Sequence, residues 1–229
     1  LESCPTCKDA LWVKAAELTL EAYRRPERVA WVNNWLPPEI VQLFDLIPFF
    51  NEIFVALMAM SGTVHEAIDE GERYTLSKDT CPFHRATLGN LAAFPAPAVL
   101  MGSSHNCNGR DKLLQIVAQE YGRPYFLIDV PNYLNPQVEG YLARQLEKLF
   151  WDLEGLFGEI DRSRIAEVFD YSNQTRANLA RANELRRHVP APYTSRSGML
   201  VIYVLRFFWG TPESVRLSEQ LCRELEGII

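Results

Sequence analysis

Cys81 and Cys107 are the residues of this sequence whose types and positions point most directly to chemistry. Cys81 stands directly before Pro82 and a stretch expected to be helical, and Cys107 stands directly before a second expected helix. The free N–H groups of a helix N-terminus stabilise negative charge, so a thiolate there is available for reaction or for binding a metal. If the two cysteines lie close together in space, they provide two ligands of a metal centre, which would need further ligands to be complete.

Each cysteine also has a plainer interpretation, as a small buried apolar residue, because free cysteine is among the most buried residue types. Two features favour a functional role. Both cysteines stand in polar, turn-rich segments. Both are also expected on one side of a sheet, at the carboxyl ends of strands, where open α/β sheets bind ligands. Thiolates in such positions hold iron–sulfur clusters, and the spacing alone leaves both interpretations open.

Other polar residues stand close to the two cysteines in the sequence. Ser104 and His105 closely precede Cys107, and His84 follows Cys81 by three residues. These side chains are candidates for donating a hydrogen bond to a cluster or a substrate. Their plainer role is helix capping and hydrogen bonding within loops.

Glu39 follows Pro37-Pro38 at an expected helix start, where a carboxylate complements the positive end of the helix dipole. Its functional alternative is a catalytic carboxylate directed into a cleft at the end of the strand expected at 29–32. At the N-terminus, Cys4 and Cys7 form a Cys-x-x-Cys pair that would supply half of a zinc site. The sequence holds no second such pair, which favours two free thiols on a flexible terminus.

The elements expected around these residues form an α/β region followed by a helical one. Apolar runs predict strands at 28–32, 98–101 and 125–130. Helices are expected at 11–23, 37–46, 63–71, 81–89, 108–121, 138–156, 162–187, 198–208 and 212–226. The apolar stretch 48–60 fits either state. Strands separated by crossover helices predict a short parallel sheet flanked by helices, of the flavodoxin- or Rossmann-like kind.

Three regions are expected on this basis: an N-terminal helical extension (1–27), an α/β cluster-binding domain (28–131) and a helical region (132–229). The chain starts without Met and stops directly after a helical stretch, so it is expected to be a fragment of a longer protein.

Composition excludes several classes of function. The net charge of −6 and the absence of a dense basic block argue against a nucleic-acid binder. The longest apolar run is interrupted by Arg206 and is too short to span a membrane. Five cysteines do not make a disulfide scaffold in a chain of this length, which favours a reducing, cytoplasmic location. The sequence carries neither of the common glycine-rich nucleotide motifs.

Several motifs occur in a characteristic order. They are Pro37-Pro38-Glu39-Ile40, Cys81 with Arg85 and Leu88-Gly89, Cys107 after a strand, Asp161-Arg162-Ser163-Arg164-Ile165, and Tyr171-Ser172-Asn173-Gln174-Thr175-Arg176. In this order the chain resembles the 2-hydroxyacyl-CoA dehydratase and benzoyl-CoA reductase family, which includes the D-component of 2-hydroxyglutaryl-CoA dehydratase. The resemblance runs from about Arg28 to the end of the chain.

The resemblance implies a [4Fe–4S] cluster held by three cysteines of a subunit, of which Cys81 and Cys107 match the first two. The third ligand would come from a second α/β domain beyond Ile229. The resemblance also implies a homologous second subunit and an ATP-hydrolysing iron–sulfur activator that delivers one low-potential electron. In dehydratases that electron reduces the thioester carbonyl of an acyl-CoA to a ketyl radical, so that the hydroxyl group can leave.

The expected function is therefore that of an iron–sulfur subunit of a radical dehydratase, which is a lyase, or of an aromatic acyl-CoA reductase, which is an oxidoreductase. Three alternatives stay open. The segment 31–46 lacks the Ala- and Gly-rich character of acyl-CoA-binding subunits, which favours a small-molecule reductase that uses no CoA substrate. The N-terminal segment 1–23 has no counterpart in the family and favours a non-catalytic docking subunit. The third alternative is a plain α/β domain with unmetallated cysteines.

Overall fold

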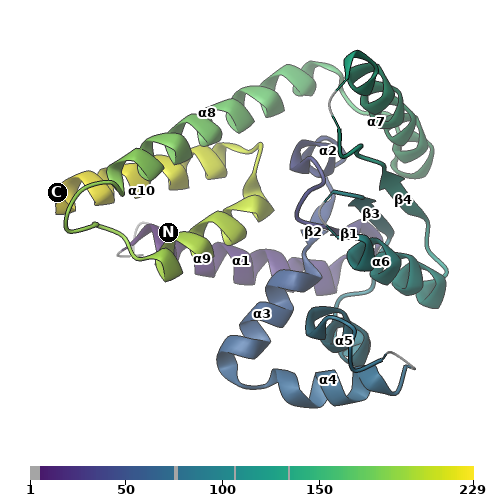
Figure 1. Ribbon diagram of the computed structural model, residues 1–229. Coiled ribbons are helices and arrows are strands. Elements are labelled where there is room, and N and C mark those ends of the chain that lie inside the picture. The colour runs from purple at the N-terminus through teal and green to yellow at the C-terminus, as the bar shows by residue number, and fades with distance from the viewer. Residues whose placement is uncertain (1–5, 75–76, 106, 134) are drawn as a thin grey trace. The chain divides into compact units, whose positions relative to one another are not determined.

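The computed structural model describes residues 6–74, 77–105, 107–133 and 135–229 (Figure 1). These residues form two compact units. The first unit comprises the residues up to Glu21, Pro37–Asp45 and Glu159–Ile229, and the second comprises Ala22–Leu36 and Leu46–Gly158. The units are discontinuous in sequence, and the division into three regions with boundaries at 27 and 131 stays a prediction.

The second unit contains a parallel sheet, as predicted. Within the described residues the sheet has four strands in the order β2-β1-β3-β4. The strands are β1 (Val29–Val32), β2 (Ile47–Phe49), β3 (Val99–Ser103) and β4 (Tyr125–Ile128). In register, Val29 lies opposite Ile47, Ala30 opposite Val99, and Leu100 opposite Tyr125. Every residue of β1, β2 and β3 is buried, which explains why β1 and β3 could be predicted from apolar runs of sequence.

The strand β2 resolves the stretch at 48–60 that fitted either state. Only Ile47-Pro48-Phe49 is strand, and α3 (Asn51–Ser61) follows it. Pro48 is tolerated because β2 lies at the edge of the sheet, where one side of the strand needs no hydrogen-bond donor. The described sheet therefore has four strands, and four carboxyl ends, where the sequence predicted three.

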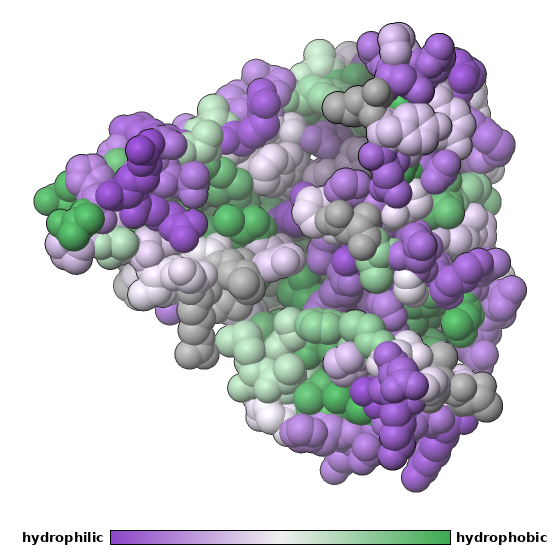
Figure 2. Space-filling model, in the orientation of Figure 1, coloured by the Kyte–Doolittle hydropathy of each residue, from purple (hydrophilic) through white to green (hydrophobic). Residues whose placement is uncertain are grey.

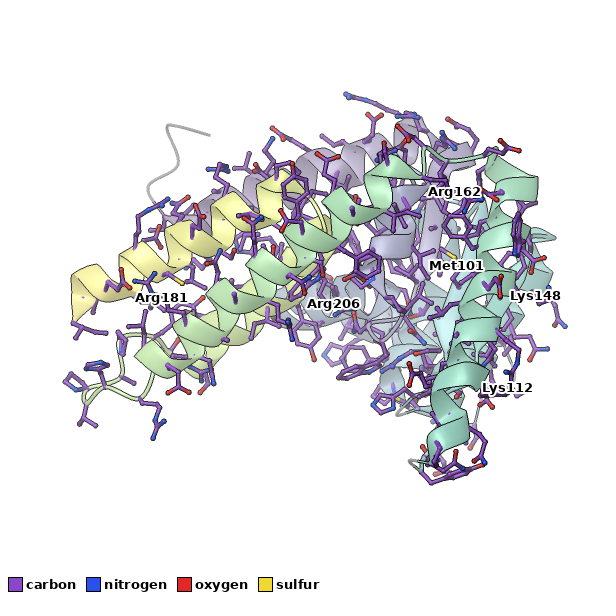
Figure 3. All side chains as sticks on the ribbon, turned by 90° about the horizontal axis from the view of Figure 1, so that it is seen from above. Met101, Lys112, Lys148, Arg162, Arg181 and Arg206 are labelled. Carbon is purple, nitrogen blue, oxygen red and sulfur yellow. The ribbon has the colours of Figure 1, made fainter. Side chains whose placement is uncertain are left out.

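Helices of the second unit pack on this sheet and on one another. The second unit holds η1 (Pro26–Arg28), α3, α4 (Val64–Glu72), α5 (Pro82–Gly89), η2 (Leu91–Ala93), α6 (Asn108–Tyr121) and α7 (Pro136–Phe157). Helix α6 packs on β3 and β4, α7 packs on β4, and α5 packs against α3, α4 and α6. Apolar side chains gather on the surface over α3 (Figure 2), and Met60 at the end of this helix is exposed. In the interior Met101 of β3 is fully buried (Figure 3).

The first unit is helical. It holds most of α1 (Cys7–Arg24), together with α2 (Pro38–Leu43), α8 (Ser163–Leu185), α9 (Ser195–Leu205), η3 (Arg206–Phe208) and α10 (Pro212–Ile228). Helices α8 and α10 lie side by side (Figures 1 and 3), joined by a hydrogen bond of 2.8 Å between the Thr175 and Ser214 hydroxyl groups. An ion pair between Arg181 and Glu226 adds to this contact. In the part of the chain that the structure describes, no helix has the length and apolar character needed to cross a membrane.

Candidate functional site

Cys81 is the N-cap residue of α5, as its position before Pro82 predicted. Its backbone carbonyl accepts hydrogen bonds from the N–H groups of His84 (2.9 Å) and Arg85 (3.2 Å). The side chain is exposed, and it makes no capping hydrogen bond to the described residues. The Cys81 sulfur is therefore available to a metal or a substrate.

Arg85 holds the backbone that leads into Cys81. Its Nε donates a hydrogen bond of 3.0 Å to the carbonyl oxygen of Thr80, the residue before Cys81. The same guanidinium forms an ion pair with Glu72 on α4. The two side chains are only 13% and 23% exposed, so water screens this pair less than it screens a surface pair. Arg85, part of the Cys81 motif, thus positions the cysteine.

Two glycines bring α4 and α5 into backbone contact. A Cβ atom on Gly89 of α5 would lie 1.9 Å from the carbonyl oxygen of Ala67, and one on Gly71 of α4 would lie 1.9 Å from the carbonyl oxygen of Arg85. Real Cβ contacts are never this short, so a side chain at either position would push the helices apart. This crossing fixes where α5 presents Cys81.

Cys107 is the N-cap residue of α6 and is half-buried. A Cβ atom on Gly109 would lie 2.6 Å from Cε1 of His84 and 3.8 Å from the Cys107 sulfur. The His84 ring of α5 and the Cys107 sulfur of α6 therefore occupy one neighbourhood, and the two helix starts are adjacent. The structure brings together His84 and Cys107, which the sequence placed on separate helices.

The two cysteines reach these positions by different routes. Cys107 follows β3 after a short loop, as predicted, whereas the element before Cys81 is α4, the helix predicted at 63–71. Cys81 is therefore placed by the packing of α5 against α4 and α6, and not by the end of a strand. Helix packing of this kind leaves no signal in the local sequence.

His84 is buried beside Cys107. Burial lowers the pKa of its imidazole, with Glu52 acting in the opposite direction and Arg110 in the same direction. The ring is therefore neutral near pH 7, with one nitrogen able to donate a hydrogen bond and the other able to accept one. His84 was predicted as a hydrogen-bond donor to a cluster or a substrate, and a neutral ring can still donate one hydrogen bond. This role stays a prediction.

The donor set fits an iron–sulfur cluster in part. Four-iron clusters are held by cysteine thiolates, and Cys81 and Cys107 match two of those ligands. Among the residues that the structure describes, no group of three or more His, Cys, Asp or Glu side chains is arranged to hold a metal ion.

Ser104 and His105 have partners of their own. The Ser104 hydroxyl donates to Oδ1 of Asp129 (2.9 Å) and accepts from the N–H of Val130 (2.8 Å), so it ties the loop after β3 to the loop after β4. His105 is exposed. Its ring contacts the Trp35 ring edge-on, with 5.4 Å between the two ring centroids. The Ser104 contacts match the loop hydrogen bonding of the plainer interpretation, and the catalytic roles of Ser104 and His105 stay predictions.

Glu39 belongs to the first unit, in the first turn of α2. The Ser172 hydroxyl of α8 donates to its carboxylate and accepts a hydrogen bond of 2.7 Å from Nε1 of Trp209. Burial lowers the pKa of Arg206, labelled in Figure 3, and the Glu39 charge opposes this shift. Glu39 and Ser172, from two of the ordered motifs, thus belong to one polar network. The catalytic role of Glu39 stays a prediction.

Two further cysteines are structural. The Cys7 thiol donates to the carbonyl oxygen of Leu217 (3.1 Å), and burial, reinforced by the nearby charge of Glu224, raises its pKa to about 12. Cys7 is thus buried at the start of α1, in place of the flexible terminus that was expected. Cys4 lies outside the described residues. The buried Cys222 thiol donates to the carbonyl oxygen of Asn178 (3.1 Å).

Sequence reasoning missed one polar group, named here the Glu52 cluster: Glu52, Arg110 and Asn34. The Glu52 carboxylate accepts from Nε of Arg110 (2.6 Å) and from Nδ2 of Asn34 (2.8 Å). The signal for it was the polar pair Asn33-Asn34 after an apolar strand. Glu52 itself would have stood out only if β2 had been recognised.

Comparisons with known proteins assign the chain to a family. A search among curated proteins finds no match to the chain. The family model of the 2-hydroxyglutaryl-CoA dehydratase D-component matches residues 35–229, which include α2, both candidate cysteines and the helices α8 to α10. Because this match covers well over half of the sequence, the chain belongs to the 2-hydroxyglutaryl-CoA dehydratase D-component family.

Proposed function

We propose that this chain is an iron–sulfur subunit, or a part of one, in a radical dehydratase or reductase that acts on an acyl-CoA thioester. Membership of the family makes it a component of a radical acyl-CoA dehydratase system. The observation that carries the finer proposal is the pair of N-cap cysteines at adjacent helix starts, where His84 of α5 lies against Cys107 of α6.

Each residue of this site has a role in the proposal. Cys81 and Cys107 bind iron, and the helix N-termini behind them offset the negative charge of the thiolates. Arg85 holds the backbone that leads into Cys81, and the Gly71–Gly89 crossing holds α5 against α4. Neutral His84 offers a hydrogen bond beside Cys107. A bound [4Fe–4S] cluster would supply single low-potential electrons for reduction of the thioester carbonyl.

Partners follow from the same proposal. Two thiolates leave the cluster incomplete, so we assign a third cysteine to a second α/β domain. A homologous second subunit and an ATP-hydrolysing activator complete the system in this proposal.

Anaerobic reconstitution tests the cluster. The chain is incubated with ferrous iron, sulfide and a small external thiol that fills the ligand positions the chain does not supply. Bound iron and the charge-transfer absorbance of thiolate–iron bonds are then measured. We expect Cys81→Ser and Cys107→Ser each to lose most of the iron, while Cys222→Ser, which changes a buried thiol, keeps it.

Two outcomes contradict the proposal. One is a wild-type chain that binds no more iron than the Cys81→Ser, Cys107→Ser double variant. The other is equal loss of iron in Cys222→Ser and Cys81→Ser, which would make the iron adventitious. Either result favours the plain α/β domain with unmetallated cysteines.

A further inference from the structure

The Glu52 cluster keeps two polar atoms without partners. Nη1 of Arg110 and Oδ1 of Asn34 are buried, and neither has a hydrogen-bond partner in the described part of the chain. Buried polar atoms are normally paired, because an unmade hydrogen bond costs stability. The Glu52 cluster has two such atoms, on two side chains that the Glu52 carboxylate holds in place by hydrogen bonds.

These residues occupy the position where α/β sheets bind ligands. Asn34 follows β1, Glu52 follows β2, and Arg110 stands in the first turn of the helix after β3. The three strands are neighbours, so their carboxyl ends lie at one edge of the sheet. His84 lies close by, since the charges of both Glu52 and Arg110 act on its pKa.

The charges of the cluster cancel. Glu52 and Arg110 form an ion pair with side chains that are only 15% and 12% exposed. A charged ligand group would leave one buried charge without compensation. The free atoms also have fixed roles, because a guanidinium nitrogen can only donate and an amide oxygen can only accept.

We infer that the Glu52 cluster binds an uncharged group that both accepts and donates a hydrogen bond, such as a primary carboxamide or a hydroxyl group. The oxygen of the group accepts from Nη1 of Arg110, and its N–H or O–H donates to Oδ1 of Asn34. A carboxylate has no hydrogen for Asn34 and places a second negative charge beside Glu52. The inference goes beyond the proposed function, because it involves neither candidate ligand cysteine and needs no iron.

Three small probes of similar shape separate these requirements. Acetamide accepts and donates, N,N-dimethylacetamide only accepts, and acetate accepts but is charged. Each is titrated into the ¹⁵N-labelled chain without iron, and the side-chain signals of Asn34 and Arg110 are followed by NMR. We expect saturable shifts with acetamide, and binding at least about tenfold weaker with the other two probes.

Variants tie the binding to the cluster. Arg110→Gln should weaken acetamide binding about tenfold or more, whereas Arg123→Gln, an exposed arginine just after the same helix, should not. Because Arg110→Gln also leaves the Glu52 charge unpaired, Asn34→Leu provides a second variant with the same expected loss. Cys81→Ser should bind acetamide as the wild type does, so failure of the iron proposal leaves this result intact.

Equal binding of acetate or N,N-dimethylacetamide overturns the inference, because the group would then not need to be neutral or to donate. Absence of saturable shifts with acetamide overturns it as well.

Discussion

The sulfur atoms of the described cysteines differ in accessibility. Cys81 is exposed and Cys107 half-buried, while Cys7 and Cys222 are buried. The sequence placed Cys81 and Cys107 correctly at helix starts, because Pro82 and the polar residues around Cys107 are local signals. It could not place Cys7, whose burial depends on Leu217 and Glu224 more than two hundred residues away.

Alkylation of the folded chain should follow this order. Cys81 reacts fastest with iodoacetamide and Cys107 more slowly, because the thiolate must be accessible to react. Cys7 and Cys222 react only after unfolding, since burial raises the pKa of both thiols. Mass spectrometry of the alkylated peptides, with and without urea, gives the order. Alkylation of Cys7 in the folded chain at the rate of Cys81 would contradict it.

Asp111 gives the second unit a pH dependence. Its side chain lies in the first turn of α6, is 8% exposed, and keeps a buried Oδ1 without a partner among the described residues. Burial raises the pKa of this carboxyl group to about 6, with Arg110 and Lys112 acting in the opposite direction. Between about pH 4 and pH 6 the Asp111 carboxyl group is therefore still protonated in the folded chain, whereas it has already lost its proton in the unfolded chain.

The free energy of unfolding should therefore fall as the pH rises from about 4 to about 6, by about 2 kcal/mol from this group. Asp111→Asn has nearly the same shape and no charge, so it should remove this part of the pH dependence. Urea denaturation at several pH values measures it, with the exposed Asp69→Asn as the control. If Asp111→Asn and Asp69→Asn show the same slope with pH, Asp111 is not the group responsible.

At the scale of the elements, α4 and α5 come into backbone contact at Gly71 and Gly89. The sequence identifies both glycines only as helix residues, because nothing in the local sequence shows that a second backbone approaches them. We expect Gly89→Ala to lower the free energy of unfolding by about 1–3 kcal/mol, because the new Cβ atom overlaps the carbonyl oxygen of Ala67.

Gly155→Ala is the matched control for this change. Gly155 also lies inside a helix, α7, and a Cβ atom there would meet nothing within 4 Å. This variant should be more stable than the wild type by about 0.5–1 kcal/mol, because alanine loses less backbone entropy in a helix. Urea denaturation of both variants decides the matter. Equal effects of the two alanines would mean that α4 and α5 do not touch at Gly89.

How well an element could be predicted depends on where its determinants lie. The bounds of α6 agree with the prediction at both ends, since it stops at Gly122 with a positive φ of 58°. The strand β2 could not be predicted, because three residues around a proline become a strand only by pairing with β1. The candidate site divides in the same way: both N-cap cysteines were predicted, but Arg85, the glycine crossing and the Glu52 cluster act through contacts between separate elements.

At the scale of the whole molecule, the second unit is discontinuous in sequence but complete as a sheet. Its strand β1 lies between β2 and β3, and all four residues of β1 are buried. The segment that supplies β1 is separated from the rest of the unit by Pro37–Asp45, which belongs to the first unit. We therefore expect the stability of the unit to depend on a short segment that lies about fifty residues or more before its two candidate cysteines in the sequence.

Two shortened chains test this dependence. A chain of residues 22–158 contains all four strands of the described sheet and both candidate cysteines, so it should unfold cooperatively on heating, as compact single units do. A chain of residues 37–158 lacks β1, which leaves β2 without its partner and uncovers one edge of β3. It should show no cooperative transition, because the buried residues of β1 form the middle of the core. Circular dichroism during heating distinguishes the two chains. Cooperative unfolding of both would contradict the strand order, and failure of both would mean that the second unit needs the first in order to fold.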